Sequence, residues 1–215
     1  MILLLDFDGT IGDTQSLIVK TLQQTISRLR LPKRTDAECA ATIGLPLVKA
    51  FTTLFGIDNK QGEHCAEVYS EIFDKNNIPN AVQMFPHVYE TIASLHHDGV
   101  RFTIASSRHR ESIVRYLDEM NLDKFIEYIV SASDVTEAKP APEMVLKTLK
   151  HLSVSPSEAI VVGDTRFDIE MAHRAGVRAI GVTYGNGTID DMKKAGADWT
   201  VDDFSLVKTV LKTLL

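Results

Sequence analysis

The chain has 215 residues, of which 44% are hydrophobic and 24% are charged, and its formal net charge at neutral pH is −6. This composition is typical of a folded globular protein and excludes a disordered chain. The acidic balance disfavours a nucleic-acid-binding surface, which needs clustered Lys and Arg side chains.

The first predicted element is a short apolar strand over residues 1–5. This run is not typical of a signal peptide, because no basic segment precedes it and Asp6 ends it. No stretch of the chain reaches the roughly 18–20 apolar residues of a membrane span. The two cysteines, Cys39 and Cys65, lack the spacing of metal ligands, so we expect free thiols in a reducing compartment. We therefore expect a cytoplasmic protein with no membrane partner.

The next part of the chain shows helical periodicity and no buried strand. Four helices are predicted, over residues 16–29, 35–42, 47–54 and 62–75, and residues 78–81 are expected to form the return linker. We expect residues 15–82 to form a small all-helical cap domain, inserted after the first strand of a core made of residues 1–14 and 83–215. Such a cap would act as a lid over a site at the strand ends.

From residue 88 onward, short apolar runs alternate with helical patterns. Strands buried on both faces are predicted at residues 101–105, 128–131, 159–162 and 179–182, and helices at 88–97, 110–120, 142–152 and 168–175. This alternation predicts an α/β fold, a Rossmann-like open parallel sheet with helices on both faces.

The most informative segment is Asp6-Phe7-Asp8-Gly9-Thr10, directly after the first strand. Residues two apart in an extended chain point to the same side, so the Asp6 and Asp8 carboxylates start as neighbours. Ligands of open α/β sheets bind at this end of the strands. Adjacent carboxylates repel unless a cation lies between them, and Gly9 permits a sharp turn. By itself, the segment is also compatible with a solvated turn.

Four motifs in order resemble those of the haloacid dehalogenase superfamily, and the resemblance covers essentially the whole chain. The first is Asp6–Thr10, and the second is Ser106-Ser107 after an apolar strand. The third is Lys139-Pro140, and the fourth is Gly163-Asp164-Thr165-Arg166-Phe167-Asp168. The helical insertion is most similar to the phosphoglycolate phosphatase-like branch of that superfamily.

The resemblance implies a Mg²⁺-dependent phosphatase. Asp6 would be the nucleophile that forms an aspartyl-phosphate, and Asp8 the general acid and base. The Mg²⁺ ligands would be the Asp6 carboxylate, the Asp8 main-chain carbonyl and the Asp164 carboxylate. Asp168 would support the waters of the metal or Lys139.

The resemblance also implies the residues that hold the phosphate. Lys139 would supply a fixed positive charge, and Ser106 a hydrogen bond to a phosphate oxygen, helped by backbone N–H groups of the turn at Ser107. We expect Arg108 to meet a second anionic group of the substrate. Thr10 is expected to support the turn beside the nucleophile.

Other activities remain as alternatives. Asp8 argues against a dehalogenase, which keeps no aspartate at that place. A sugar phosphomutase of the β-phosphoglucomutase type uses both aspartates, but residues 15–30 hold no His of the kind such caps use. Phosphonate C–P cleavage would need a cap lysine such as Lys49. A non-catalytic phosphate-binding module would be expected to have lost an acid–base or metal-binding group, and none is missing here. The motifs leave open whether the substrate is phosphoglycolate, pyrophosphate, a nucleotide or a sugar phosphate, and whether the chain is a monomer or a dimer.

Overall fold

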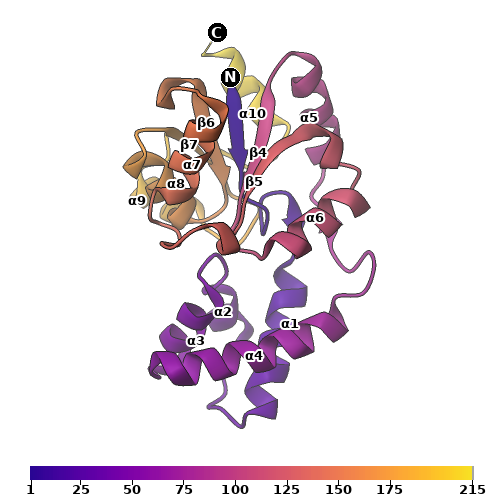
Figure 1. Ribbon diagram of the computed structural model, residues 1–215, viewed down its shortest axis with the longest axis vertical. Helices are drawn as coiled ribbons and strands as arrows, with labels where there is room; N and C mark the ends of the chain where they lie inside the picture. The colour runs from indigo at the N-terminus through magenta and orange to yellow at the C-terminus, as the bar shows by residue number, and fades with distance from the viewer. Residues whose placement is uncertain (215) are drawn as a thin grey trace.

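A six-stranded, all-parallel β-sheet forms the centre of the computed structural model, which describes residues 1–214 (Figure 1). Its strand order is β5-β4-β1-β6-β7-β8, so the first strand lies in the middle. The strands are β1 (Ile2–Leu5), β4 (Arg101–Ala105), β5 (Ile126–Val130), β6 (Ala159–Gly163), β7 (Arg178–Val182) and β8 (Trp199–Val201). The predicted α/β class and Rossmann-like sheet are confirmed.

Helices cover both faces of the sheet because alternate residues of each strand point in opposite directions. Leu3 and Leu5 pack on one face with α5, α6 and α10, whereas Ile2 and Leu4 pack on the other with α7, α8 and α9. The helices are α5 (Val88–His97), α6 (Arg110–Glu119), α7 (Glu143–Leu152), α8 (Arg166–Arg174), α9 (Ile189–Ala195) and α10 (Leu206–Lys212). Short 3₁₀ turns lie at Asp123–Phe125, Ala132–Asp134 and Pro156–Glu158. All four residues of β1 are buried, as expected for a strand covered on both sides.

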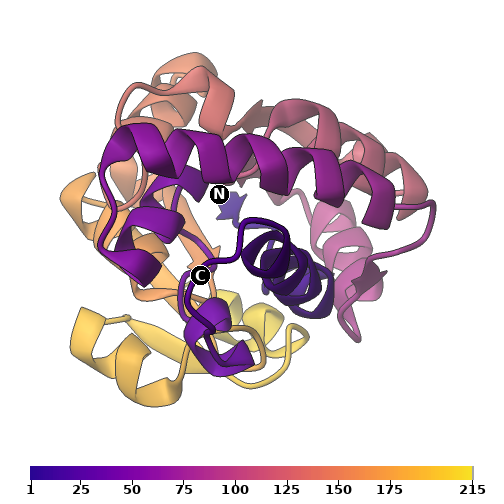
Figure 2. The ribbon, with the colours of Figure 1, turned by 90° about the horizontal axis from the view of Figure 1, so that it is seen from below.

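The four helices α1–α4 lie together beyond the carboxyl ends of the strands, and we call them the four-helix segment (Figure 1). They are α1 (Gln15–Arg28), α2 (Asp36–Ala40), α3 (Leu47–Phe55) and α4 (Asn59–Asn76). The long helix α4 crosses α1 in Figure 1, and Figure 2 looks at the molecule from the side of this segment, with α1 seen nearly end-on. The predicted division into a core and a cap domain rests on this segment and stays a prediction.

A short two-stranded ladder joins the two connections to the four-helix segment. β2 (Gly12–Asp13) pairs antiparallel with β3 (Gln83–Met84), with Gly12 opposite Met84 and Asp13 opposite Gln83. The helical periodicity of the surrounding residues gave no sign of these strands, because each has only two residues.

The carboxyl-terminal strand β8 and the helices α9 and α10 were also not predicted. β8 has three residues at the edge of the sheet, too few for an apolar run to be distinguished. Within residues 1–214, no helix combines the length and the apolar character that crossing a lipid bilayer requires.

Candidate active site

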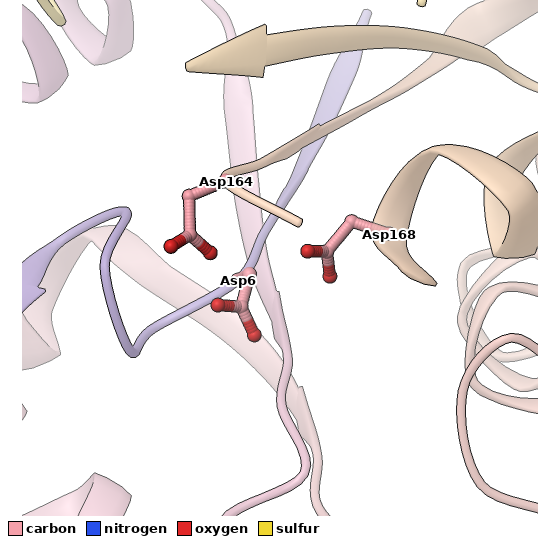
Figure 3. Close-up of side chains that lie close together, drawn as sticks. All are labelled: Asp6, Asp164 and Asp168. Carbon is pink, nitrogen blue, oxygen red and sulfur yellow. The ribbon is translucent and has the colours of Figure 1, made fainter. Parts of the chain in front are cut away.

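Three carboxylates meet where β1 and β6 end side by side. Asp6 follows β1, Asp164 follows β6, and Asp168 lies in the first turn of α8. Each offers an oxygen within 4.8 Å of the others, and Figure 3 shows the three carboxylates gathered at this point. Their exposed fractions are 7%, 0% and 1%. The residues that follow β1 and β6 lie close together because Leu5 of β1 is paired with Val162 of β6.

Lys139 joins two of these carboxylates. Its Nζ lies 2.6 Å from Oδ1 of Asp6 and 2.6 Å from Oδ1 of Asp168, and the residue is only 4% exposed. Burial lowers the pKa of Lys139, but the charges of Asp168 and Asp6 raise it, and the net shift is upward. The side chain is therefore a buried ammonium group aimed at the predicted nucleophile.

The orientation of Asp168 comes from the start of α8. Its Oδ2 accepts hydrogen bonds from the backbone N–H of Thr165 (3.0 Å) and from the Thr165 hydroxyl (2.6 Å). This is a capping box, in which the third helical residue closes the first turn. Since one oxygen caps the helix, the other is left to hold Lys139.

Asp164 is oriented by Asn186, a residue in the loop after β7. Oδ2 of Asp164 accepts hydrogen bonds from the backbone N–H (2.6 Å) and the side-chain amide (2.8 Å) of Asn186. Its other oxygen, Oδ1, is buried and has no hydrogen-bond partner within the described residues. Sequence analysis did not identify Asn186, although a polar residue between two glycines shortly after a predicted strand is the signal that could have indicated it.

The first loop approaches Asp164 so closely that it needs a glycine. Gly9 has a φ of +87°, and a Cβ atom placed there would lie 1.9 Å from Oδ2 of Asp164. A Cβ atom at Gly185 would lie 2.2 Å from the carbonyl oxygen of Gly9. The loops after β1, β6 and β7 thus enclose one carboxylate.

The cluster carries more negative charge than its one ammonium group can neutralise. Burial raises the pKa of Asp6 to about 7, against the lowering effect of Lys139, and the charges of Asp168 and Asp8 raise it further. Burial and the charges of Asp6 and Asp168 also raise the pKa of Asp164 well above its usual range. A divalent cation that prefers oxygen ligands would relieve this repulsion and use the unpaired oxygen of Asp164. The donor set therefore fits Mg²⁺.

The predicted acid–base residue, Asp8, is bound to Arg108. Arg108 Nη2 lies 2.6 Å from Oδ1 of Asp8, and Arg108 Nε lies 3.2 Å from each carboxylate oxygen. The structure thus places Arg108 beside the predicted chemistry but in contact with a protein carboxylate. Its predicted contact with a substrate anion stays a prediction.

The remaining predicted residues surround this centre. Ser106 is fully buried at the end of β4, and its Oγ accepts a hydrogen bond from the Arg108 backbone N–H (3.3 Å). The Ser107 hydroxyl donates to the carbonyl oxygen of Gly44 (3.0 Å), which belongs to the four-helix segment. The buried Thr10 accepts a hydrogen bond at its carbonyl oxygen from the Tyr184 hydroxyl (2.8 Å).

Lys49, the residue considered for phosphonate cleavage, is exposed on α3. A lysine that forms a Schiff base is usually one whose pKa is lowered by burial. The exposure of Lys49 gives that alternative no support.

Comparison with known proteins decides the family. A family model described as haloacid dehalogenase-like hydrolase matches residues 3–182. The chain belongs to this family. The hydrolase is 34% identical over 217 aligned residues to a Dickeya dadantii protein described as a probable phosphatase, IndB, with 100% of this chain and 94% of the relative covered. It is 30% identical over 212 residues to pyrophosphatase PpaX of Oceanobacillus iheyensis, covering 97% of this chain and 95% of that protein.

A solved structure shows the same fold over nearly the whole length. A Bacteroides fragilis protein assigned to the haloacid dehalogenase-like hydrolases superposes with a TM-score of 0.91 at 30% identity, covering 96% of this chain and 98% of the other. The resemblance stated from the four motifs, and the enzyme class that follows from it, are confirmed.

Proposed function

We propose that this hydrolase is a Mg²⁺-dependent phosphatase that cleaves small phosphate compounds through an aspartyl-phosphate on Asp6. The observation that supports it is the position of Asp6, at the end of the central strand, between the ammonium of Lys139 and the carboxylate of Asp164. A nucleophilic carboxylate needs nearby positive charge to approach an anionic phosphate, and here Lys139 would supply it on one side and a Mg²⁺ at Asp164 on the other.

Mg²⁺ would be held by the carboxylates of Asp6 and Asp164 and, from the family resemblance, by the main-chain carbonyl of Asp8. When bound, it would neutralise phosphate charge and orient the phosphoryl group. Asn186 holds Oδ2 of Asp164 by two hydrogen bonds, which leaves Oδ1, buried and without a hydrogen-bond partner among the described residues, as a candidate metal ligand. Asp168 keeps Lys139 in place from the start of α8.

The residues then perform two displacements. In the first, an oxygen of Asp6 forms a bond to phosphorus, the bond to the leaving oxygen breaks, and that oxygen receives a proton from Asp8. In the second, Asp8 takes a proton from water, the water oxygen attacks phosphorus, and the bond to Asp6 breaks to release phosphate. Lys139 and the hydroxyl of Ser106 would stabilise the phosphoryl oxygens throughout.

The four-helix segment would act as a cap. The carboxylates are almost fully buried, and Ser107 contacts Gly44 across the boundary between the sheet and these helices. We infer that residues 15–82 move away to admit substrate and close to exclude water, while residues 1–14 and 83–215 hold the catalytic groups.

The test is a panel of phosphate compounds assayed with Mg²⁺, comprising p-nitrophenyl phosphate, phosphoglycolate, pyrophosphate, nucleotides and sugar phosphates. Wild-type protein should release phosphate from at least one of them, and chelation of the metal should stop the release. Asp6→Asn should abolish activity, whereas Asp118→Asn, an exposed aspartate of α6, should not change it. Activity that persists in Asp6→Asn would contradict the proposal.

A further inference from the structure

Arg108 forms a close ion pair with Asp8, and the proposed two-step reaction does not explain this pair. It approaches Asp8 with two nitrogens, at distances of 2.6 to 3.2 Å, and both oxygens of Asp8 accept from it. The side chains of Arg108 and Asp8 are only 8% and 15% exposed. Such a forked contact is the strongest geometry between arginine and a carboxylate.

The guanidinium of Arg108 lies over two aromatic rings from different parts of the molecule. Its central carbon is 5.2 Å from the ring centre of Phe73 on α4, and 5.3 Å from that of Tyr116 on α6. Tyr116 is fixed in turn, because its ring stacks on Phe7 at 5.4 Å and its hydroxyl donates to Asn77 Oδ1 at 2.5 Å. Arg108 is therefore held where the four-helix segment meets the core.

This contact conflicts with the role of Asp8. An acid–base group must present an oxygen to the leaving group and then to water, and here both oxygens are occupied by donors of Arg108. Moving Arg108 away alone would leave a buried cation without a partner, which is costly. The ion pair can open at low cost only if another anion takes the place of Asp8.

We propose that Arg108 is a specificity-determining residue that exchanges Asp8 for a second anionic group of the substrate. This inference rests on the proposed phosphatase function and narrows its substrate class. The preferred substrate then carries a phosphate or a carboxylate on the leaving group, close to the phosphoryl group that is transferred. Binding of that anion to Arg108 releases Asp8 for proton transfer.

The same contacts explain how a neutral leaving group would be disfavoured. A phosphate ester of a simple alcohol or phenol offers Arg108 no second anion, so the ion pair with Asp8 persists. The contacts of the guanidinium with Phe73 and Tyr116 do not depend on which anion accepts its N–H groups, so they can persist when the acceptor changes. A substrate with a second anion is favoured because it forms a new ion pair with Arg108. A substrate without one is disfavoured because releasing Asp8 would leave the charge of Arg108 unpaired.

The experiment compares kcat/KM for pyrophosphate, phosphoglycolate and p-nitrophenyl phosphate. These supply a second phosphate, a second carboxylate and no second anion. In Arg108→Ala, the ratio of kcat/KM for the better anionic substrate to that for p-nitrophenyl phosphate should fall about tenfold or more, as expected for loss of a charged hydrogen bond. Arg108→Lys, which keeps the charge and loses the fork, should show a smaller fall. Which anionic substrate is affected distinguishes phosphate from carboxylate recognition.

Arg101→Ala is the matched control. Arg101 makes a similar forked contact with Glu127, but it lies at the start of β4, whereas Arg108 follows the end of that strand. The substitution Arg101→Ala should therefore leave the ratio unchanged. If the activity depends on Asp6 but the ratio changes less than tenfold in Arg108→Ala, the role proposed for Arg108 is wrong and the proposed phosphatase function stands. Absence of Mg²⁺-dependent activity on all substrates would overturn the proposed function and this inference with it.

A binding measurement makes the test independent of turnover. Titration calorimetry with Mg²⁺ present should show that methylenediphosphonate, which is not hydrolysed, binds wild-type protein more tightly than inorganic phosphate does. Arg108→Ala should remove that preference, provided that its circular dichroism spectrum matches that of the wild type. If a folded Arg108→Ala protein keeps the preference, the inference is wrong.

Discussion

Lys139 Nζ lies 2.6 Å from Oδ1 of Asp6, and the two residues are 133 positions apart in the chain. Neither charge is exposed to water that could screen it, so each depends on the other and on Asp168. This contact brings the first and third sequence motifs together at one buried site.

The first prediction concerns Lys139. Lys139→Met removes the cation beside the nucleophile and should lower kcat by about a hundredfold or more, as for other groups that stabilise transition-state charge. Lys150→Met, at an exposed position of α7, is the control and should retain full activity. A Lys139→Met enzyme with nearly normal kcat would show that its charge serves only the fold.

The second prediction concerns Asp6 and pH in the metal-free protein. Burial raises the pKa of Asp6 to about 7 from a usual value of 3.8. Between these values the folded state binds more protons than the unfolded state, so the contribution of Asp6 to stability is present at low pH and is lost as the pH rises to about 7. Asp6→Asn should therefore be more stable than the wild type by about 1–4 kcal/mol at pH 8, and this difference should shrink toward pH 4.

Thermal unfolding in the presence of a chelator, measured across this pH range, tests the second prediction. Adding Mg²⁺ should raise the melting temperature of the wild type more than that of Asp6→Asn, because the variant has lost a ligand. A stability difference that is constant with pH would mean that the Asp6 carboxylate keeps an ordinary pKa.

The third prediction concerns Asn186. Asn186→Ala removes one of the two hydrogen bonds that orient Asp164 and should weaken Mg²⁺ binding by about tenfold or more, as is typical for residues that support a metal ligand. Calorimetry with Mg²⁺ measures this without turnover. Asn59→Ala, at an exposed position of α4, should bind Mg²⁺ like the wild type. Equal affinities for all three proteins would exclude a positioning role.

The fourth prediction compares two glycines with similar backbone angles. Gly9 and Gly99 have φ values of +87° and +84°, but only Gly9 lacks space, since a Cβ atom at Gly99 would meet nothing within 4 Å. Gly99→Ala should cost about 1 kcal/mol of stability and leave the activity intact. Gly9→Ala should displace Asp164 and abolish Mg²⁺ binding, which calorimetry on the folded variant would show. Equal effects of the two substitutions would mean that backbone strain alone matters at Gly9.

Much of the core could be predicted from the sequence because its strands are buried on both faces. Residues 159–162 are apolar throughout, which predicts a buried strand, and β4 and β6 begin where predicted. The carboxyl-terminal strand β8 has only three residues, and tertiary pairing with β7 decides it. Local periodicity cannot show that pairing.

The site divides in the same way. Asp6, Asp164 and Lys139 each follow a strongly predicted strand or belong to a motif, so the topology brings them together. Asn186 binds Asp164 through a contact between two loops, and no local pattern encodes it. The ion pair of Arg108 with Asp8 depends in the same way on a fold-level approach of segments a hundred residues apart.

The ladder between β2 and β3 determines how the four-helix segment can travel. Because hydrogen bonds tie both crossings of the chain together, the closure proposed for this segment would be a swing about one axis, not a slide over the sheet. Such a swing would separate Phe73, on α4, from Arg108, whereas Asp6, Asp164 and Lys139 all belong to the part of the chain outside the four-helix segment. Each opening would thus change the surroundings of the Asp8–Arg108 pair, whereas the contacts of Asp6 with Lys139 would stay the same.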